Sequence, residues 1–255
     1  MRPGAFRVAG LALALALATA GCGAAPGEPG KAPTRHTVVV LAASSLTESL
    51  TAAARDFEAS HPGTEIQLSF AASSTVVTQV NQGAPADLIA LAGTAAAGPL
   101  DKSRIARDGI RTMARNTLEI VTPPGNPGNV NTMSDLARGS LKVVLCAATV
   151  PCGKAAAKAL SLAGVTANVV SYETDVKATL AKVRLGEADA AIVYHSDVVA
   201  GGASVRGVQI PAAVNQTLDY PLIRLTDDAT TVEFAAHLLS AQGHKRLRDA
   251  GFMTP

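Results

Sequence analysis

Short apolar runs alternate with longer segments of helical periodicity from residue 38 onward. Residues 38–41 predict a buried strand, and the apolar residues after it recur every three or four positions until Pro62 ends the helix. Residues 66–70 predict the next strand, a second helix ends at Gly83, and residues 87–91 predict a third strand. This order of strands and helices favours parallel strands with helices on both faces of a sheet.

A second round of the same alternation begins after an irregular stretch. Its first strand, residues 118–121, leads into a proline-rich loop. The later expected elements are strands 141–145, 168–171 and 190–193, helices 153–163 and 176–185, and terminal helices 230–240 and 245–250. Two α/β rounds of this kind predict two lobes with a cleft between them.

The segment before this pattern has the composition of an export signal. Two arginines precede an uncharged apolar run, residues 8–20, which is shorter than the ~20 apolar residues of a membrane-spanning helix. Cys22 follows a glycine at the end of the run, as in a bacterial lipobox. We therefore expect residues 1–21 to be a signal peptide and Cys22 to be lipidated; the alternative is an ordinary signal peptide with an incidental cysteine. Residues 22–35, rich in Gly, Pro and Ala, predict a flexible tether.

Composition narrows the classes of function. Hydrophobic residues make up 48% of the chain and aromatic residues only 3%, so we expect a core of small aliphatic side chains. The net charge is +2, and without Arg2 and Arg7 the basic and acidic residues balance. No Lys/Arg cluster of the nuclear-localisation or phosphate-backbone-binding type occurs, and few aromatic side chains are present to stack on bases. These features argue against nucleic-acid binding.

Motifs of common enzymes are absent from the sequence. It has no Gly-x-Ser-x-Gly elbow, no His-Glu-x-x-His, no Walker loop and no Gly-x-Gly-x-x-Gly after a strand, and its five histidines are dispersed. We therefore do not expect an enzyme, and the sequence implies no cofactor.

Cys146 and Cys152 remain as a pair once Cys22 is assigned to the lipid anchor. In an exported chain we expect a disulfide between them, and two free thiols are the alternative. A zinc site has little support, because closed zinc sites use four ligands and no histidine stands near these cysteines.

Small hydroxyl residues stand where predicted strands end and helices begin. Ser45 follows the first strand and Ser73 follows the second, while Cys152 and Val176 stand at two further helix starts. Free N–H groups and the positive end of the helix dipole make such turns suitable for anions, and ligands of open α/β sheets bind at the carboxyl ends of strands. The alternative for Ser45 is that it only caps its helix, in a capping box with Glu48.

Tyr194 ends the last apolar run of the second round, at the carboxyl end of a predicted strand. There its hydroxyl would face the cleft and donate a hydrogen bond to an oxyanion. The alternative is a tyrosine that packs by its ring at the edge of the core.

Six stretches carry a more specific resemblance. They are Ala-Ala-Ser-Ser-Leu-Thr at 42–47, Phe-Ala-Ala-Ser-Ser-Thr at 70–75, Gly-Ala-Pro-Ala-Asp-Leu at 83–88, Val-Pro-Cys-Gly at 150–153, Asp-Val at 175–176 and Ile-Val-Tyr-His-Ser-Asp at 192–197. In order and spacing they resemble the molybdate-binding components of ABC-type importers, which belong to the type II periplasmic binding protein superfamily. The resemblance runs from about residue 38 to residue 252.

The resemblance implies a set of oxyanion ligands. They are the hydroxyl and backbone N–H groups of Ser45 and Ser73, the backbone N–H groups of Cys152 and Val176, and the hydroxyl of Tyr194. All are hydrogen-bond donors, which suits a dianion and disfavours partners that must donate a hydrogen bond themselves, such as protonated phosphate. Molybdenum would enter only as molybdate. The family often has Ala where Cys152 stands, and a Cys146–Cys152 link would stiffen that turn.

The expectation is therefore a bilobal α/β binding protein. Lobe I comprises residues 36–117 plus 217–255, lobe II comprises residues 118–216, and the lobes close on the anion by a hinge motion. The resemblance implies a lipid-anchored, extracytoplasmic monomer that delivers molybdate or tungstate to an ABC permease and its ATPase. Rival interpretations are another tetrahedral anion, such as sulfate or thiosulfate, an enzyme on the same fold, and a sensor that docks a membrane partner without transport.

Overall fold

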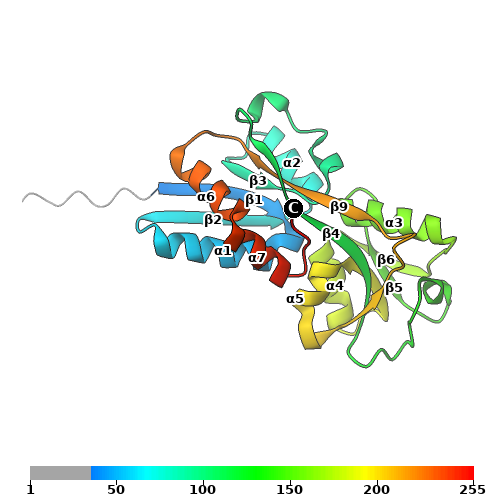
Figure 1. Ribbon diagram of the computed structural model, residues 1–255. Helices are drawn as coiled ribbons and strands as arrows, with labels where there is room; N and C mark the ends of the chain where they lie inside the picture. Colours follow the sequence, from blue (N-terminus) through cyan, green and yellow to red (C-terminus); the bar gives the residue numbers. More distant parts are fainter. Residues whose placement is uncertain (1–35) are drawn as a thin grey trace, which may run out of the picture. The chain divides into compact units, whose positions relative to one another are not determined.

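The alternating pattern forms strands and helices throughout residues 36–255, the part of the chain that the computed structural model describes (Figure 1). The predicted signal peptide 1–21, the lipidated Cys22 and the tether 22–35 lie outside the described residues. Between residues 36 and 255, no helix is both long enough and apolar enough to cross a membrane.

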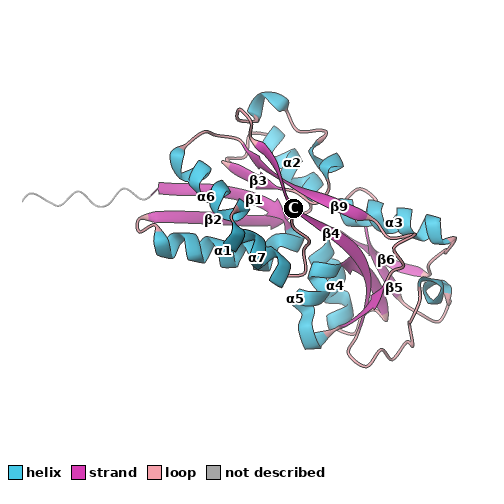
Figure 2. Cartoon of the chain, viewed as in Figure 1, coloured by secondary structure: helices cyan, strands magenta, loops and turns pink. Residues whose placement is uncertain are grey.

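Nine strands in the described residues form one sheet, in which eight follow the order β2–β1–β3–β9–β4–β7–β5–β6 and β8 pairs with β4 off this path (Figure 2). Their bounds are β1 His36–Ala43, β2 Thr64–Ala71, β3 Leu88–Ala90, β4 Ile110–Thr122, β5 Val143–Cys146, β6 Val169–Glu173, β7 Ala190–Tyr194, β8 Arg206–Gln209 and β9 Thr217–Arg224. Strands β1, β2 and β3 are parallel, and so are β5, β6 and β7. Both parallel groups match the prediction from the alternating pattern.

Helices cover both faces of the sheet. They are α1 Thr47–Ser60, α2 Ser73–Asn81, α3 Pro151–Ala163, α4 Val176–Arg184, α5 His195–Gly201, α6 Ala229–Leu239 and α7 Ala241–Asp249. On one face Phe57 of α1 packs edge-on against Phe234 of α6, with 5.1 Å between ring centroids. On the other face Val76, Val77 and Val80 of α2 join a separate apolar cluster. In β1, Val40 and Ala42 belong to the main apolar cluster and Leu41 belongs to the α2 cluster, so alternate residues face opposite sides, as the pleat of a strand requires.

Strand β4 changes partners along its length. Residues 110–117 pair with β9, whereas residues 118–122 pair with β7 and β8. Strands β4 and β9 therefore connect the two parallel groups. This change of partner supports our proposal that lobe I comprises residues 36–117 plus 217–255 and lobe II residues 118–216.

The sequence interpretation missed part of this connection. The stretch before residue 118 was expected to be irregular, but β4 begins at Ile110. Polar side chains such as Arg111 and Arg115 face solvent there, so the apolar periodicity is broken although the backbone is extended. The short elements α5 and β8 were also not expected; α5 begins directly after β7, with no turn residues to mark it.

Candidate anion-binding site

The five residues expected to bind an anion line one small cavity. Its volume is about 10 Å³, and its walls include Ser45, Ser73, Cys152, Val176 and Tyr194. These side chains are between 1% and 4% exposed. Each residue follows the carboxyl end of a strand or stands at the start of a helix. The fold therefore gathers segments separated by up to 149 positions of sequence around a single point, because the carboxyl ends of strands from both parallel groups meet there.

Ser73 is the first residue of α2, and no side chain caps that helix. The first N–H groups of a helix have no partner within it, so they are available to a ligand. The Ser73 Oγ accepts a hydrogen bond from the backbone N–H of Ala92, with 2.8 Å between the atoms. Because this contact uses a lone pair, the hydroxyl proton of Ser73 stays free to donate into the cavity.

Ser45 lies in a short 3-10 turn, Ser44–Leu46, between β1 and α1. Its Oγ lies 3.0 Å from the hydroxyl of Tyr220 on β9. The alternative interpretation as a capping box is wrong: the residue that precedes α1 is Leu46, no side chain caps either helix, and the carboxylate of Glu48 binds Lys177 instead. The side chain of Ser45 is thus held at the cavity and does not cap the helix that follows it.

Val176 is the first residue of α4, directly after Asp175. The Asp175 carboxylate accepts hydrogen bonds from the N–H groups of Lys177 and Ala178, at 2.8 and 3.0 Å. This cap satisfies the second and third N–H groups of the helix and leaves that of Val176 outside it.

Cys152 stands in the first turn of α3 and forms a disulfide with Cys146, the last residue of β5. Pro151 precedes it and has no N–H group, so Cys152 and Gly153 supply the first donors of this helix. A Cβ on Gly153 would collide with the carbonyl oxygens of Ala147 and Cys146, so glycine is required for this close approach. The disulfide and the glycine together hold the turn against β5.

Removal of the disulfide tests how much it contributes. We expect the variant Cys146→Ser/Cys152→Ser to lose about 2 kcal/mol of unfolding free energy, because a short closed loop is released in the unfolded chain. Anion affinity should fall only moderately, since the donor at Cys152 is a backbone N–H. Urea unfolding and calorimetric titration measure the two effects. A reductant should reproduce both in the wild type and change nothing in the variant; equal stability of all samples would contradict the prediction.

Tyr194 ends β7 and reaches the cavity with its side chain. Its ring packs edge-on against Tyr220, with 6.0 Å between centroids. The Tyr194 hydroxyl makes no hydrogen bond of good geometry with any described residue. Burial raises the pKa of this hydroxyl well above its usual value, so it keeps its proton and is available as a donor.

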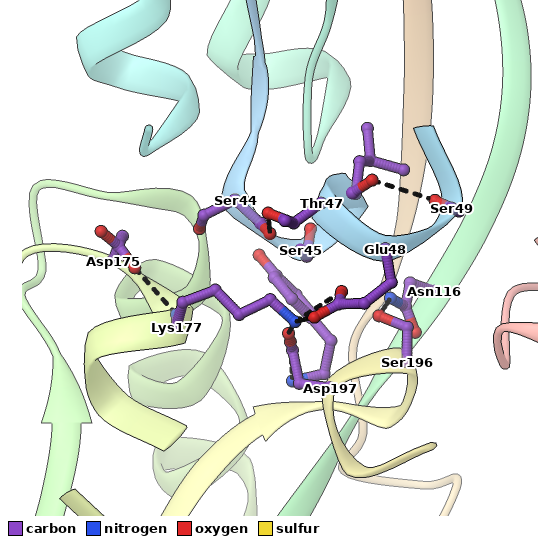
Figure 3. A network of polar contacts seen from close by, with 12 residues as sticks. Ser44, Ser45, Thr47, Glu48, Ser49, Asn116, Asp175, Lys177, Ser196 and Asp197 are labelled. Atoms are coloured by element: carbon purple, nitrogen blue, oxygen red, sulfur yellow. Dashed lines mark hydrogen bonds and ion pairs between the residues drawn. The ribbon is translucent and has the colours of Figure 1, made fainter. Parts of the chain in front are cut away.

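A chain of ion pairs lies beside the cavity (Figure 3). The Nζ of Lys177 lies 2.8 Å from both carboxylate oxygens of Glu48 and 3.1 Å from Oδ1 of Asp197. The Oδ2 of Asp197 accepts the backbone N–H of Tyr194 at 3.3 Å. Burial raises the pKa of Asp197 to about 6, although Lys177 opposes the shift. Burial also acts to lower the pKa of Lys177, but the carboxylates of Asp197 and Glu48 outweigh it and raise that pKa.

Sequence reasoning missed several residues around the ligand set. Lys177, Asn116, Asp197 and Tyr220 were not among the predicted ligands. Asp197 had one usable signal, because it is three residues after Tyr194 and can cap the helix that follows. Asn116 and Tyr220 had none, since their contact joins positions 104 residues apart.

The cavity is lined by neutral groups and one capping carboxylate, that of Asp175, with no Lys or Arg side chain in its wall. Among residues 36–255, no group of three or more His, Cys, Asp and Glu side chains is placed to hold a metal ion. The arrangement can hold a small anion through directed hydrogen bonds, and no nucleophile–base pair stands in the cavity wall.

The fold and the cavity define an α/β protein of the solute-binding class. Residues 38–253 match the model of a family described as bacterial extracellular solute-binding protein. The chain belongs to this family.

Individual relatives and structures agree with this assignment. The molybdate-binding protein ModA of Mycobacterium tuberculosis strain H37Rv is 35% identical over 240 residues, which cover 92% of each chain. The structure of the periplasmic molybdate-binding protein of Azotobacter vinelandii has a TM-score of 0.76 and 19% identity, and covers 86% of this chain and 99% of its own. The sulfate-binding protein SubI of Mycobacterium tuberculosis H37Rv has a TM-score of 0.74 and 20% identity, and covers 86% of both chains. The two structures show the same fold.

Proposed function

We propose that this protein is the extracytoplasmic solute-binding component of an ABC importer, that it binds molybdate and tungstate between its two lobes, and that it delivers them to the permease. The observation that carries the proposal is the convergence of hydroxyl and backbone N–H donors on one buried cavity. The mycobacterial relative of similar length, which is named for molybdate binding, supports the choice of ligand.

The proposed ligands are Ser45, Ser73, Cys152, Val176 and Tyr194. Each of these residues donates a hydrogen bond and none has to accept one from the ligand, so the set suits a fully deprotonated oxyanion. Directed dipoles in a buried site can stabilise such an anion without a cationic side chain. No chemistry on the ligand and no resident cofactor are proposed, and molybdenum enters only as molybdate.

A second candidate ligand is sulfate or thiosulfate, because the sulfate-binding neighbour has the same fold. A likeness at 20% identity supports the fold alone, whereas the relative named for molybdate is 35% identical over nearly the whole chain. Molybdate is therefore the favoured ligand, and sulfate is an outcome of the test.

The proposal includes the route to the membrane. Removal of residues 1–21, lipidation of Cys22 and the tether 22–35 would anchor a monomer outside the cytoplasm, next to its permease and ATPase. Labelling of cells with a radioactive fatty acid should mark the wild type and leave the variant Cys22→Ser unmarked. A labelled variant, or an unlabelled wild type, would contradict the anchor.

Calorimetric titration of the purified protein with molybdate, tungstate, sulfate and phosphate tests the ligand. We expect one anion per chain for molybdate and tungstate, and at least about a hundredfold weaker binding of sulfate and phosphate, a difference of roughly 3 kcal/mol. Tight binding of sulfate alone would transfer the function to the second candidate. Binding of none of the four anions would overturn the proposed ligand class.

A further inference from the structure

The hydroxyl of Ser45 lies at the end of a chain of buried hydrogen bonds. The chain begins at Asn116 on β4, passes through Tyr220 on β9 and reaches Ser45. The Nδ2 of Asn116 is 3.4 Å from the Tyr220 hydroxyl, which is 3.0 Å from the Oγ of Ser45. Asn116 is 1% exposed and Tyr220 is fully buried, so water does not compete for these contacts. Neither Asn116 nor Tyr220 lines the cavity itself.

The direction of this chain is fixed at the Asn116 end. The Oδ1 of Asn116 accepts the backbone N–H of Thr117 at 3.0 Å. The amide therefore turns its NH₂ group the other way, where it donates to the Oγ of Ser196 at 2.8 Å and to the hydroxyl of Tyr220. A carbonyl oxygen in that position would leave the Thr117 N–H without this acceptor.

The direction of hydrogen-bond donation at Tyr220 determines the role of Ser45. A phenol has one proton, and the hydrogen bonds of the buried Tyr220 hydroxyl to described residues run to Asn116 Nδ2, which can only donate, and to Ser45. The Oγ of Ser45 is therefore the acceptor for the Tyr220 proton, because a buried proton without an acceptor would be costly. Burial raises the pKa of Tyr220 far above its usual value, so the proton stays on the phenol. When Ser45 accepts a hydrogen bond from Tyr220, its own hydroxyl proton remains available. Because Ser45 lines the cavity, it can donate that proton in a hydrogen bond to an anion there.

We propose that Asn116 and Tyr220 are positioning residues that fix Ser45 as a donor, and that they thereby favour fully deprotonated tetrahedral oxyanions over protonated ones. The inference rests on the proposed function of the cavity. If the hydroxyl of Ser45 were free to rotate, it could accept a hydrogen bond from a protonated anion such as dihydrogen phosphate. While Tyr220 donates to Ser45, the Ser45 proton has no other acceptor among the described residues, so turning it away from the anion is unfavourable and such an anion is disfavoured.

An isosteric substitution at Asn116 tests the proposal by reversing the direction of the hydrogen bonds from residue 116 through Tyr220 to Ser45. In Asn116→Asp the new carboxylate still accepts the Thr117 N–H, but it cannot donate to Tyr220. The Tyr220 proton turns to the carboxylate, Tyr220 accepts from Ser45, and the Ser45 proton leaves the cavity. We expect the Kd for molybdate at pH 8 to rise at least about tenfold, the size of one lost hydrogen bond to a charged partner. The ratio of the phosphate Kd at pH 6 to the molybdate Kd should fall by a similar factor.

A second substitution separates this effect from simple charge repulsion. Tyr220→Phe should weaken molybdate binding in the wild type, by about threefold, because Ser45 loses its partner. In the Asn116→Asp background the same change should strengthen binding severalfold, because it removes the hydroxyl that draws the Ser45 proton away. Repulsion by the carboxylate alone predicts weaker or unchanged binding in both backgrounds, and that result would overturn the inference.

Near-ultraviolet circular dichroism shows whether Asn116→Asp folds. If it does not, a double-mutant cycle of Tyr220 and Ser45, which introduces no charge, tests the same inference. Tyr220→Phe should weaken molybdate binding in the wild type and leave it unchanged in Ser45→Ala. Equal weakening in both backgrounds would overturn the inference while the proposed function stands. If the wild type binds none of molybdate, tungstate, sulfate and phosphate, both fail together.

Discussion

The variant Ser45→Ala/Ser73→Ala is expected to lose about two to four orders of magnitude in affinity for molybdate. Each substitution removes one hydroxyl donor to a buried dianion, and a hydrogen bond to a charged group contributes roughly 1.5–3 kcal/mol. The backbone N–H groups of both residues survive the change, so the cavity keeps part of its donor set. Calorimetric titration at constant pH measures the loss.

Ser74→Ala provides the matched control for this double variant. Ser74 stands next to Ser73 in the first turn of α2, but its side chain is not part of the cavity wall. The control should bind molybdate as the wild type does, within about a factor of two. A double variant that binds as tightly as Ser74→Ala would remove the assigned roles of both hydroxyls.

The second large effect is expected at Lys177. Within the described residues, this lysine is the cation that pairs with the fully buried carboxylate of Asp197. Lys177→Met keeps an unbranched apolar stem and removes the charge, so Asp197 is left unpaired. Breaking a buried pair on one side costs about 3–5 kcal/mol, and we expect a loss of unfolding free energy near the lower value at pH 8.

The loss depends on pH through Asp197. Its pKa in the folded protein is raised from 3.8 to about 6, so the folded state binds this proton more readily than the unfolded chain does. The free energy of unfolding therefore falls as pH rises through that window and stays lower above it. Without Lys177 the pKa of Asp197 rises further and the window extends upward. The gap between wild type and variant should thus widen between pH 5 and pH 8 in urea unfolding.

The double variant Lys177→Met/Asp197→Asn checks the cause. The amide can still accept the N–H of Tyr194, and no carboxylate remains to be left unpaired. Most of the lost stability at pH 8 should return, and the gap should no longer widen with pH. A gap of constant size in Lys177→Met, unaffected by the second change, would mean that Lys177 acts through Glu48 or through packing instead.

Elements with a clear apolar period could be predicted from the sequence, because their burial follows one face or one run. The strand of residues 38–41 and the helix after it fall within β1 and α1 with small shifts at the ends. The first part of β4 could not be predicted in this way, since its residues 110–112 are all exposed and it is held by pairing with β9, about a hundred positions later.

Only part of the candidate site could be predicted from sequence motifs. The five proposed ligands stand at turns whose local sequence is distinctive, and the structure brings them to one cavity. The local rule failed at Ser45, where a good capping-box sequence forms no capping box, because Glu48 and Ser45 each have a tertiary partner. The roles of the five ligands, the lobe limits and the lipid anchor remain predictions.

The tyrosines of the chain have a practical consequence. It contains three tyrosines and no tryptophan. Tyr194 lines the cavity and Tyr220 packs against its ring, both buried, whereas Tyr172 is 62% exposed on β6. The intrinsic fluorescence of the protein therefore comes from its tyrosines, of which one lines the cavity and a second packs against the first. Anion capture should consequently be visible in real time by stopped-flow fluorescence of the unlabelled wild-type protein.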